Sequence, residues 1–158
     1  MPIKEKKLVV LGDSGVGKTA LIQRFIGDVF SEEYRPTVGA MPYKKTLEVN
    51  GTRVSLVIWD VAGHILKLHP AFASGAHGAI LVCDLARQES FNSVLEWHDV
   101  IKAKLGDIPV VVAGNKSDIA GADECKALHD AGYRGYRTSA KTGENVDRLF
   151  NELVRSIS

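Results

Sequence analysis

The chain has 158 residues, of which 45% are hydrophobic and 25% charged, and its formal net charge is +1 at pH 7. This length suits one domain with a substantial core, and the near-neutral charge argues against a basic nucleic-acid-binding surface. No apolar segment approaches the length of a membrane span, no signal peptide precedes the first apolar run, and the two cysteines have no metal-ligand neighbours. We therefore expect a single cytoplasmic domain over residues 1–158, without a nucleic-acid partner.

Short apolar runs alternate with helical patterns along the whole chain. Nearly continuous apolar residues predict strands buried on both faces at Leu8–Leu11, Ala79–Cys83 and Val110–Ala113. A helical period predicts helices at Thr19–Ile26, Ser90–Leu105, Asp123–Ala131 and Asn145–Ile157. The charged cluster Lys4–Lys7 is expected to be a solvated lead-in to the first strand.

Asn50-Gly51 is a strong signal for a type I′ β-hairpin. It separates two further strand patterns, Lys44–Val49 and Arg53–Trp59, and Pro42 suits the beginning of an edge strand. Another strand is expected at Tyr133–Arg137. The alternation predicts an α/β fold, a three-layer sandwich around a mostly parallel sheet with one antiparallel edge hairpin. Ligands of such a sheet bind at the carboxyl ends of its strands.

A glycine-rich loop joins the first strand to the first helix: Gly12-Asp13-Ser14-Gly15-Val16-Gly17-Lys18-Thr19. This strand–GxxxxGK(S/T)–helix arrangement is typical of a phosphate-binding loop, whose backbone N–H groups and helix N-terminus bind phosphate oxygens. Lys18 is expected to reach the terminal phosphates, and Thr19 to ligate Mg²⁺. The pattern predicts nucleotide contacts from Asp13, Ser14, Gly15, Val16, Gly17, Lys18, Thr19 and Ala20. The alternative is a glycine-rich turn before an ordinary helix.

Asp60 follows the second strand of the expected hairpin and precedes Val61-Ala62-Gly63. A carboxylate at the end of a buried strand, next to a phosphate loop, can hold Mg²⁺, usually through water. Gly63 can offer an unobstructed backbone N–H to a terminal phosphate. An isolated Asp-x-x-Gly is more often a turn, but its place after an apolar strand favours the functional interpretation.

The segment Asn115-Lys116-Ser117-Asp118 follows the last apolar run. The Asp118 carboxylate can accept two hydrogens from guanine, which adenine cannot supply, and the wrong base leaves buried polar groups unpaired. Lys116 can lay its stem along the base, and Asn115 can tie loops together. The later segment Ser139-Ala140-Lys141 can supply a backbone N–H for the base carbonyl. The alternative is an Asx-rich turn. The segment Asn115-Lys116-Ser117-Asp118 as a whole disfavours an ATP-using P-loop enzyme.

These segments, in this order and separation, resemble the small GTPases of the Ras superfamily, and most closely their Rab branch, from Lys7 to Ile157. Residues 30–39 look like switch I, residues 59–63 are similar to the start of switch II, and residues 75–79 are also Rab-like. The resemblance implies the P-loop small G-protein fold and bound GTP or GDP with Mg²⁺. It also implies effector, exchange-factor and GTPase-activating partners that contact switch loops 30–43 and 60–75.

The resemblance implies roles for three further residues. Thr37 would coordinate Mg²⁺ and sense the γ-phosphate. Phe30 would pack against the guanine and Tyr34 would cover the phosphates, although both could equally be loop anchors. The catalytic set is then expected to comprise His64, Lys18 and Thr37, and the metal ligands Thr19, Thr37 and Asp60.

The sequence departs from the family pattern in several places. His64 stands where the family usually has a glutamine that orients the attacking water. It could position that water, leave hydrolysis slow, or point away from the site. Residues 64–74 look two residues shorter than the Rab pattern, and Pro42 replaces a docking aromatic residue. No lipidation motif is visible, so either a lipidated tail lies beyond Ser158 or the protein acts without its own anchor.

Two functions from different classes fit these observations. The first is a guanine-nucleotide switch that binds GTP or GDP with Mg²⁺, slowly hydrolyses GTP and changes the conformation of its switch loops to control partner binding. The second is a GTP- or GDP-binding interaction module with little or no hydrolysis, for which His64 is the main ground. The protein is expected to be a monomer.

Overall fold

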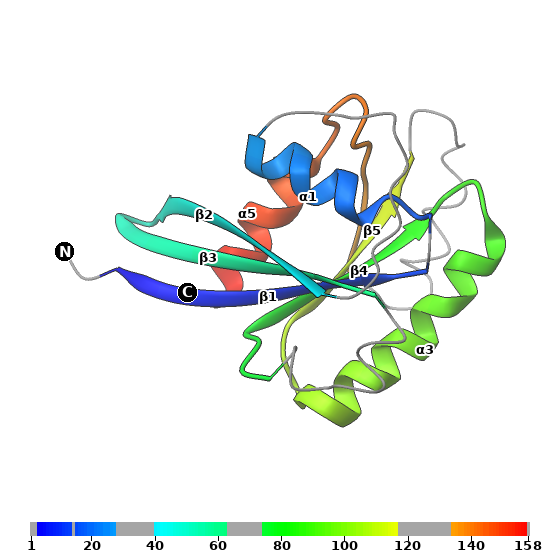
Figure 1. Cartoon of the computed structure of the whole chain (residues 1–158), viewed down its shortest axis with the longest axis horizontal. Coiled ribbons are helices and arrows are strands. Elements are labelled where there is room, and N and C mark those ends of the chain that lie inside the picture. Colours follow the sequence, from blue (N-terminus) through cyan, green and yellow to red (C-terminus); the bar gives the residue numbers. More distant parts are fainter. Residues whose placement is uncertain (1–2, 14, 28–39, 63–73, 117–133, 158) are drawn as a thin grey trace.

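The computed structural model describes residues 3–13, 15–27, 40–62, 74–116 and 134–157. They form a six-stranded sheet with strand order β2-β3-β1-β4-β5-β6 and helices on both faces (Figure 1). The strands are β1 (Lys4–Gly12), β2 (Ala40–Val49), β3 (Thr52–Val61), β4 (Gly78–Asp84), β5 (Val110–Asn115) and β6 (Gly135–Arg137). The helices are α1 (Lys18–Gly27), α3 (Gln88–Leu105) and α5 (Val146–Ile157).

The sheet is parallel except at one edge. β1 lies between β3 and β4 and is parallel to both, while β4–β5 and β5–β6 are parallel pairs. Only β2–β3 is antiparallel among the strands that the structure describes. The predicted α/β sandwich with one antiparallel edge hairpin is therefore confirmed. Lys4–Lys7 are exposed or half-buried, as expected for a solvated segment, but they do not precede the strand: they belong to β1 itself, because their backbones pair with β3 from Val54 onward.

The edge hairpin turns as the sequence predicts. Asn50 and Gly51 have φ angles of 51° and 78°, the positive values that a type I′ turn requires. Pro42 lies within β2 at the edge of the sheet, where a missing N–H donor is tolerated. At the other end of the hairpin Ala40, the first residue of β2, pairs with Val61, the last residue of β3. The beginning of β2 and the end of β3 therefore lie side by side at this end of the hairpin.

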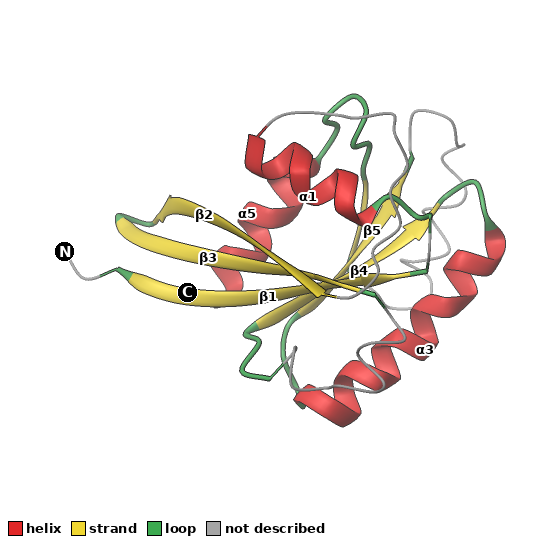
Figure 2. Ribbon diagram, viewed as in Figure 1, coloured by secondary structure: helices red, strands yellow, loops and turns green. Residues whose placement is uncertain are grey.

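Side chains of β1 alternate between two hydrophobic clusters. Leu8 and Val10 join the cluster that α1 and α5 cover, whereas Val9 and Leu11 join the one that α3 covers. Figure 2 shows these helices on opposite faces of the sheet. α5 is as amphipathic as predicted, and its Phe150 ring stacks on Phe25 of α1 with 4.1 Å between centroids. Burial on both faces explains the nearly continuous apolar runs.

The carboxyl ends of the parallel strands meet at one edge of the sheet. There β1 ends at Gly12, where a Cβ would lie 2.5 Å from the carbonyl oxygen of Val82, so only glycine allows the two strands to approach this closely. The end of β3 carries Asp60, and those of β4 and β5 carry Asp84 and Asn115. The helix expected at Asp123–Ala131 lies outside the described residues. No helix in the described ranges is long and apolar enough to cross a membrane.

Candidate functional site

The loop between β1 and α1 has the backbone of an anion-binding turn. Gly15 and Gly17 have φ angles of 82° and 93°, in the left-handed region that favours glycine. A Cβ on Gly17 would also lie 2.5 Å from Nδ2 of Asn115, so a larger residue would displace that side chain. Left-handed residues next to right-handed ones turn successive N–H groups toward a common concavity.

The carbonyl groups of Gly15, Val16 and Gly17 point away from that concavity. The Asn115 side-chain amide donates to the carbonyl oxygen of Val16 at 3.0 Å, and the Lys116 ammonium donates to that of Gly15 at 3.0 Å. The carbonyl oxygen of Gly17 accepts the first helical bond of α1, from the N–H of Leu21 at 2.9 Å. In a trans peptide the next N–H points opposite to the carbonyl. The N–H groups that follow Val16 and Gly17 are thus directed to the other side, where an anion can bind them.

Lys18, Thr19 and Asp60 meet at the mouth of the loop. The Lys18 ammonium lies 3.2 Å from Oδ1 of Asp60, and the Thr19 hydroxyl donates to Oδ2 of the same carboxylate. Lys18 and Asp60 are buried, with side chains only 8% and 1% exposed. Charged groups this deeply buried are costly unless they are paired. Here Lys18 and Thr19 of α1 pair with Asp60 of β3, so these contacts connect the helix to the strand. The hydroxyl and the carboxylate are hard oxygen donors of the kind that Mg²⁺ prefers, so this donor set fits that ion.

Tyr43 of β2 lies near this cluster. Burial raises the pKa of its phenol, and the negative charge of Asp60 adds to the increase, while a hydrogen bond with Gln23 lowers it. The phenol therefore stays protonated and neutral near the Asp60 carboxylate at physiological pH.

Asn115 connects three segments. Besides its bond to Val16, its Oδ1 accepts a hydrogen bond from the hydroxyl of Thr138 at 3.2 Å, and the N–H of Thr138 donates to the carbonyl of Gly114 at 2.8 Å. Asn115 is 2% exposed and Thr138 fully buried. The interpretation of Asn115 as a tie between loops is confirmed: it links the phosphate loop to the segment that follows β6.

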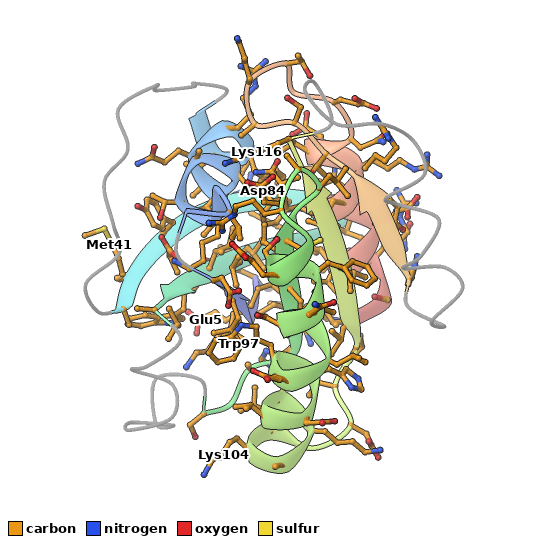
Figure 3. All side chains as sticks on the ribbon, turned by 90° about the vertical axis from the view of Figure 1, so that its right-hand side faces the viewer. Glu5, Met41, Asp84, Trp97, Lys104 and Lys116 are labelled. Atoms are coloured by element: carbon orange, nitrogen blue, oxygen red, sulfur yellow. The ribbon has the colours of Figure 1, made fainter. Side chains whose placement is uncertain are left out.

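Lys116 follows in a left-handed conformation with φ of 67°. Its ammonium lies 2.9 Å from Oδ2 of Asp84, in addition to its bond to Gly15 (Figure 3). The other Asp84 oxygen accepts the N–H of Ala86 at 2.8 Å. The sequence analysis did not predict a role for Asp84. A signal was present, because Asp84 is an acidic residue at the end of an apolar strand, the same feature that identified Asp60.

The segment after β6 is also held in place. The Ser139 hydroxyl accepts the N–H of Thr142 at 3.1 Å, and the Arg24 guanidinium of α1 donates to the carbonyl oxygen of Thr142 at 3.2 Å. Ser139 and Ala140 are buried, while Lys141 is exposed. The structure thus places these three predicted residues at the edge of the sheet where β5 and the phosphate loop end.

Several predicted site residues lie outside the described residues. They are Ser14, Phe30, Tyr34, Thr37, Gly63, His64 and Asp118. Those that the structure describes fall into two neighbouring groups. One comprises the phosphate loop with Lys18, Thr19 and Asp60. The other comprises Asn115 and Lys116, with the segment Ser139-Ala140-Lys141 beside them.

Comparison with known proteins identifies the family. The family model described as the Ras family matches residues 7–158. The chain belongs to the Ras family. It is 38% identical to the Ras-related protein Rab-13 of Mesocricetus auratus over 160 aligned positions, which cover 96% of this chain and 79% of that protein. This small GTPase is equally similar to the Ras-related protein RABF2b of Arabidopsis thaliana, at 38% identity over 96% of this chain and 80% of that one.

A third relative is the GTP-binding protein YPTM2 of Zea mays, at 37% identity over 96% of this chain and 79% of that protein. The relatives place this small GTPase in the Rab branch, as its sequence motifs suggest. It is a GTP-binding switch that hydrolyses GTP and responds to regulator and effector proteins. The alternative of a binding module without hydrolysis is not favoured by any of these comparisons.

Proposed function

We propose that the two groups of residues at the carboxyl edge of the sheet form one guanine-nucleotide site in a single G domain, residues 1–158. The N–H groups of the loop and the Lys18 ammonium would bind the phosphates. Asn115, Lys116 and Asp118 would hold the guanine, with Ser139, Ala140 and Lys141 beside it. The observation that carries the proposal is the pair of bonds from Asn115 and Lys116 to the phosphate-loop carbonyls, because they join a base-reading segment to an anion-binding one.

Thr19 and Asp60 would hold Mg²⁺, together with Thr37. Held by these residues, Mg²⁺ would supply positive charge that offsets the negative charge of the phosphates. The contact between Thr19 and Asp60 supports this assignment, because a hydroxyl and a carboxylate in contact can both turn toward one cation. Lys18, now 3.2 Å from Asp60, could instead bind phosphate oxygens. We expect Lys18 to pair with Asp60 at one stage of the nucleotide cycle and with phosphate oxygens at another.

Residues 30–43 and 60–75 would act as switch loops for effectors, exchange factors and GTPase-activating proteins. Thr37 and Gly63 would sense the terminal phosphate, and Phe30 and Tyr34 would cover the base and the phosphates. His64 would stand next to the attacking water, where the family usually has the glutamine that orients it. We expect intrinsic hydrolysis of GTP to be slow because that glutamine is missing. The described ends of these loops support the proposal, because Ala40 and Val61 are paired neighbours beside the Asp60 cluster. We place this monomeric switch in the cytoplasm.

Calorimetric titration of the protein with GDP and Mg²⁺ tests the site. We expect binding by the natural protein, loss of most affinity in Lys18→Ala, and normal affinity in Lys102→Ala, an exposed lysine of α3. Asp118→Asn should shift the preference from guanine to xanthine nucleotides, because an amide can donate to the extra carbonyl. Retained affinity in Lys18→Ala would exclude the phosphate-loop assignment, and unchanged guanine selectivity would remove Asp118 from the base site.

A further inference from the structure

The carboxylate of Asp13, in the phosphate loop, is held by helix α3. The hydroxyl of Ser93 donates to its Oδ2 at 2.6 Å, and the indole N–H of Trp97 donates to its Oδ1 at 3.2 Å. Ser93 and Trp97 are four residues apart in α3 and so lie on the same face of the helix. Both oxygens of a loop carboxylate are therefore bound by one helix, on the face of the sheet opposite α1.

The two donors on α3 are themselves well anchored. Trp97, which extends from α3 in Figure 3, packs against the hydrophobic cluster between α3 and the sheet. The Ser93 hydroxyl also lies 3.1 Å from the carbonyl of Glu89, one turn earlier. Both donors are therefore held by contacts within α3 and the cluster as well as by Asp13.

A negative charge at this position needs such a restraint. The loop is built to attract anions, and Asp13 is only four residues before Gly17, whose N–H faces the expected phosphate side. A carboxylate that turned toward bound phosphates would repel them, and the repulsion would grow with the number of phosphate charges. Hydrogen bonds from Ser93 and Trp97 turn the charge toward α3 instead.

We propose that Asp13 is a positioning residue of the phosphate loop, and that Ser93 and Trp97 keep its charge away from the nucleotide and so set the affinity for GTP over GDP. This inference rests on the proposed nucleotide site and assigns α3 a part in nucleotide selection. It accounts for a carboxylate within an anion-binding loop, for which the phosphate chemistry alone gives no reason.

Dissociation rates of fluorescent GDP and of a non-hydrolysable GTP analogue test the inference. Ser93→Ala removes one donor with little change of shape, and Trp97→Phe removes the other but keeps an aromatic ring at that position. We expect each to speed release of the GTP analogue about tenfold, the equivalent of one lost hydrogen bond to a charged group. Release of GDP should accelerate less, and the difference should shrink at high salt because screening weakens the repulsion. Ser156→Ala, which removes a helix hydroxyl bonded within α5, is the matched control and should leave both rates unchanged.

Combining each variant with Asp13→Ala separates positioning from a purely structural role. Without the carboxylate, Ser93→Ala and Trp97→Phe should have no further effect on the release rates. Equal effects in both backgrounds would overturn the proposal, as would single variants that release both nucleotides like the natural protein but melt at a lower temperature. If the natural protein fails to bind GDP at all, the nucleotide site itself is wrong. If it binds and only the variants show no effect, this inference alone fails.

Discussion

The backbone N–H of Lys7 donates to Nδ1 of His77 at 3.0 Å, and the N–H of His77 returns a bond to the carbonyl of Lys7 at 2.8 Å. The Lys7 ammonium also donates to the carbonyl of Ser74 at 2.8 Å. These bonds fix the approach to β4, at the end of the segment proposed as switch II. Because Nδ1 accepts a hydrogen bond, His77 must be unprotonated at that nitrogen.

This arrangement predicts a pH dependence of stability. Burial lowers the pKa of His77, and the positive charge of Lys6 adds to the effect. The unfolded state therefore binds the proton first as the pH falls through about 6.5. The contribution of His77 is fully present above that pH, decreases below it, and stops changing below the pKa of the folded protein. Because His77 is largely exposed, the effect should be small.

Urea unfolding at a series of pH values between about 5 and 7 measures this contribution. His77→Asn keeps an oxygen acceptor near the position of Nδ1 but does not titrate, so the free energy of unfolding should depend less on pH in this variant. His98→Asn, the same change in α3, serves as the control. Identical pH profiles for His77→Asn and the natural protein would contradict the prediction.

Asn115→Ala should destabilise both the fold and the nucleotide complex. The change leaves the carbonyl of Val16 and the hydroxyl of Thr138 without their partner in a buried site, which costs about 2 kcal/mol. Thr138→Val removes only one of these bonds and should cost less. Thermal unfolding and the GDP dissociation rate give the two measurements. A variant as stable as the natural protein would show that water replaces the amide.

Asp84→Asn should weaken nucleotide binding through Lys116. The substituted amide can keep the bond to the N–H of Ala86, but it no longer offers a negative charge to the Lys116 ammonium 2.9 Å away. We expect roughly tenfold weaker GDP binding, in line with the loss of a charged hydrogen bond. Titration calorimetry measures the affinity, with the exposed Asp107→Asn as the control. Unchanged GDP affinity would mean that Lys116 needs no such partner.

His64→Gln should increase the rate of GTP hydrolysis. A glutamine amide can both donate and accept hydrogen bonds and thereby orient an attacking water, as in related GTPases. Release of phosphate in a single turnover, with GTP preloaded, measures the step apart from nucleotide exchange. Equal rates in the two proteins would show that this position does not limit hydrolysis.

Periodicity predicted most of the sheet and the described helices. The apolar runs of β1, β4 and β5, the turn at Asn50-Gly51 and the stripe of α5 are local patterns with a direct structural cause. Boundaries were less accurate. The charged residues Lys4–Lys7 belong to β1 because pairing with β3, far away in the sequence, extends the strand beyond its apolar part.

The site was predicted only where a motif marks it. The glycine-rich loop and Asn115 have recognisable spacing, whereas the bonds of Asp84 to Lys116 and of Asp13 to α3 join residues 32 and 80 or more positions apart. Such pairings depend on tertiary packing and have no local signature. Lys116 was expected to lie along the base, and its bonds to Asp84 and Gly15 became visible only in the structure.

The register of the edge hairpin has a mechanical consequence. Ala40 and Val61 share the last rung of the ladder, so a displacement of the end of β2 at this rung is opposed by its pairing with β3. A protein that contacts the edge of the sheet at this rung would touch the ends of both strands at once, one residue from Asp60.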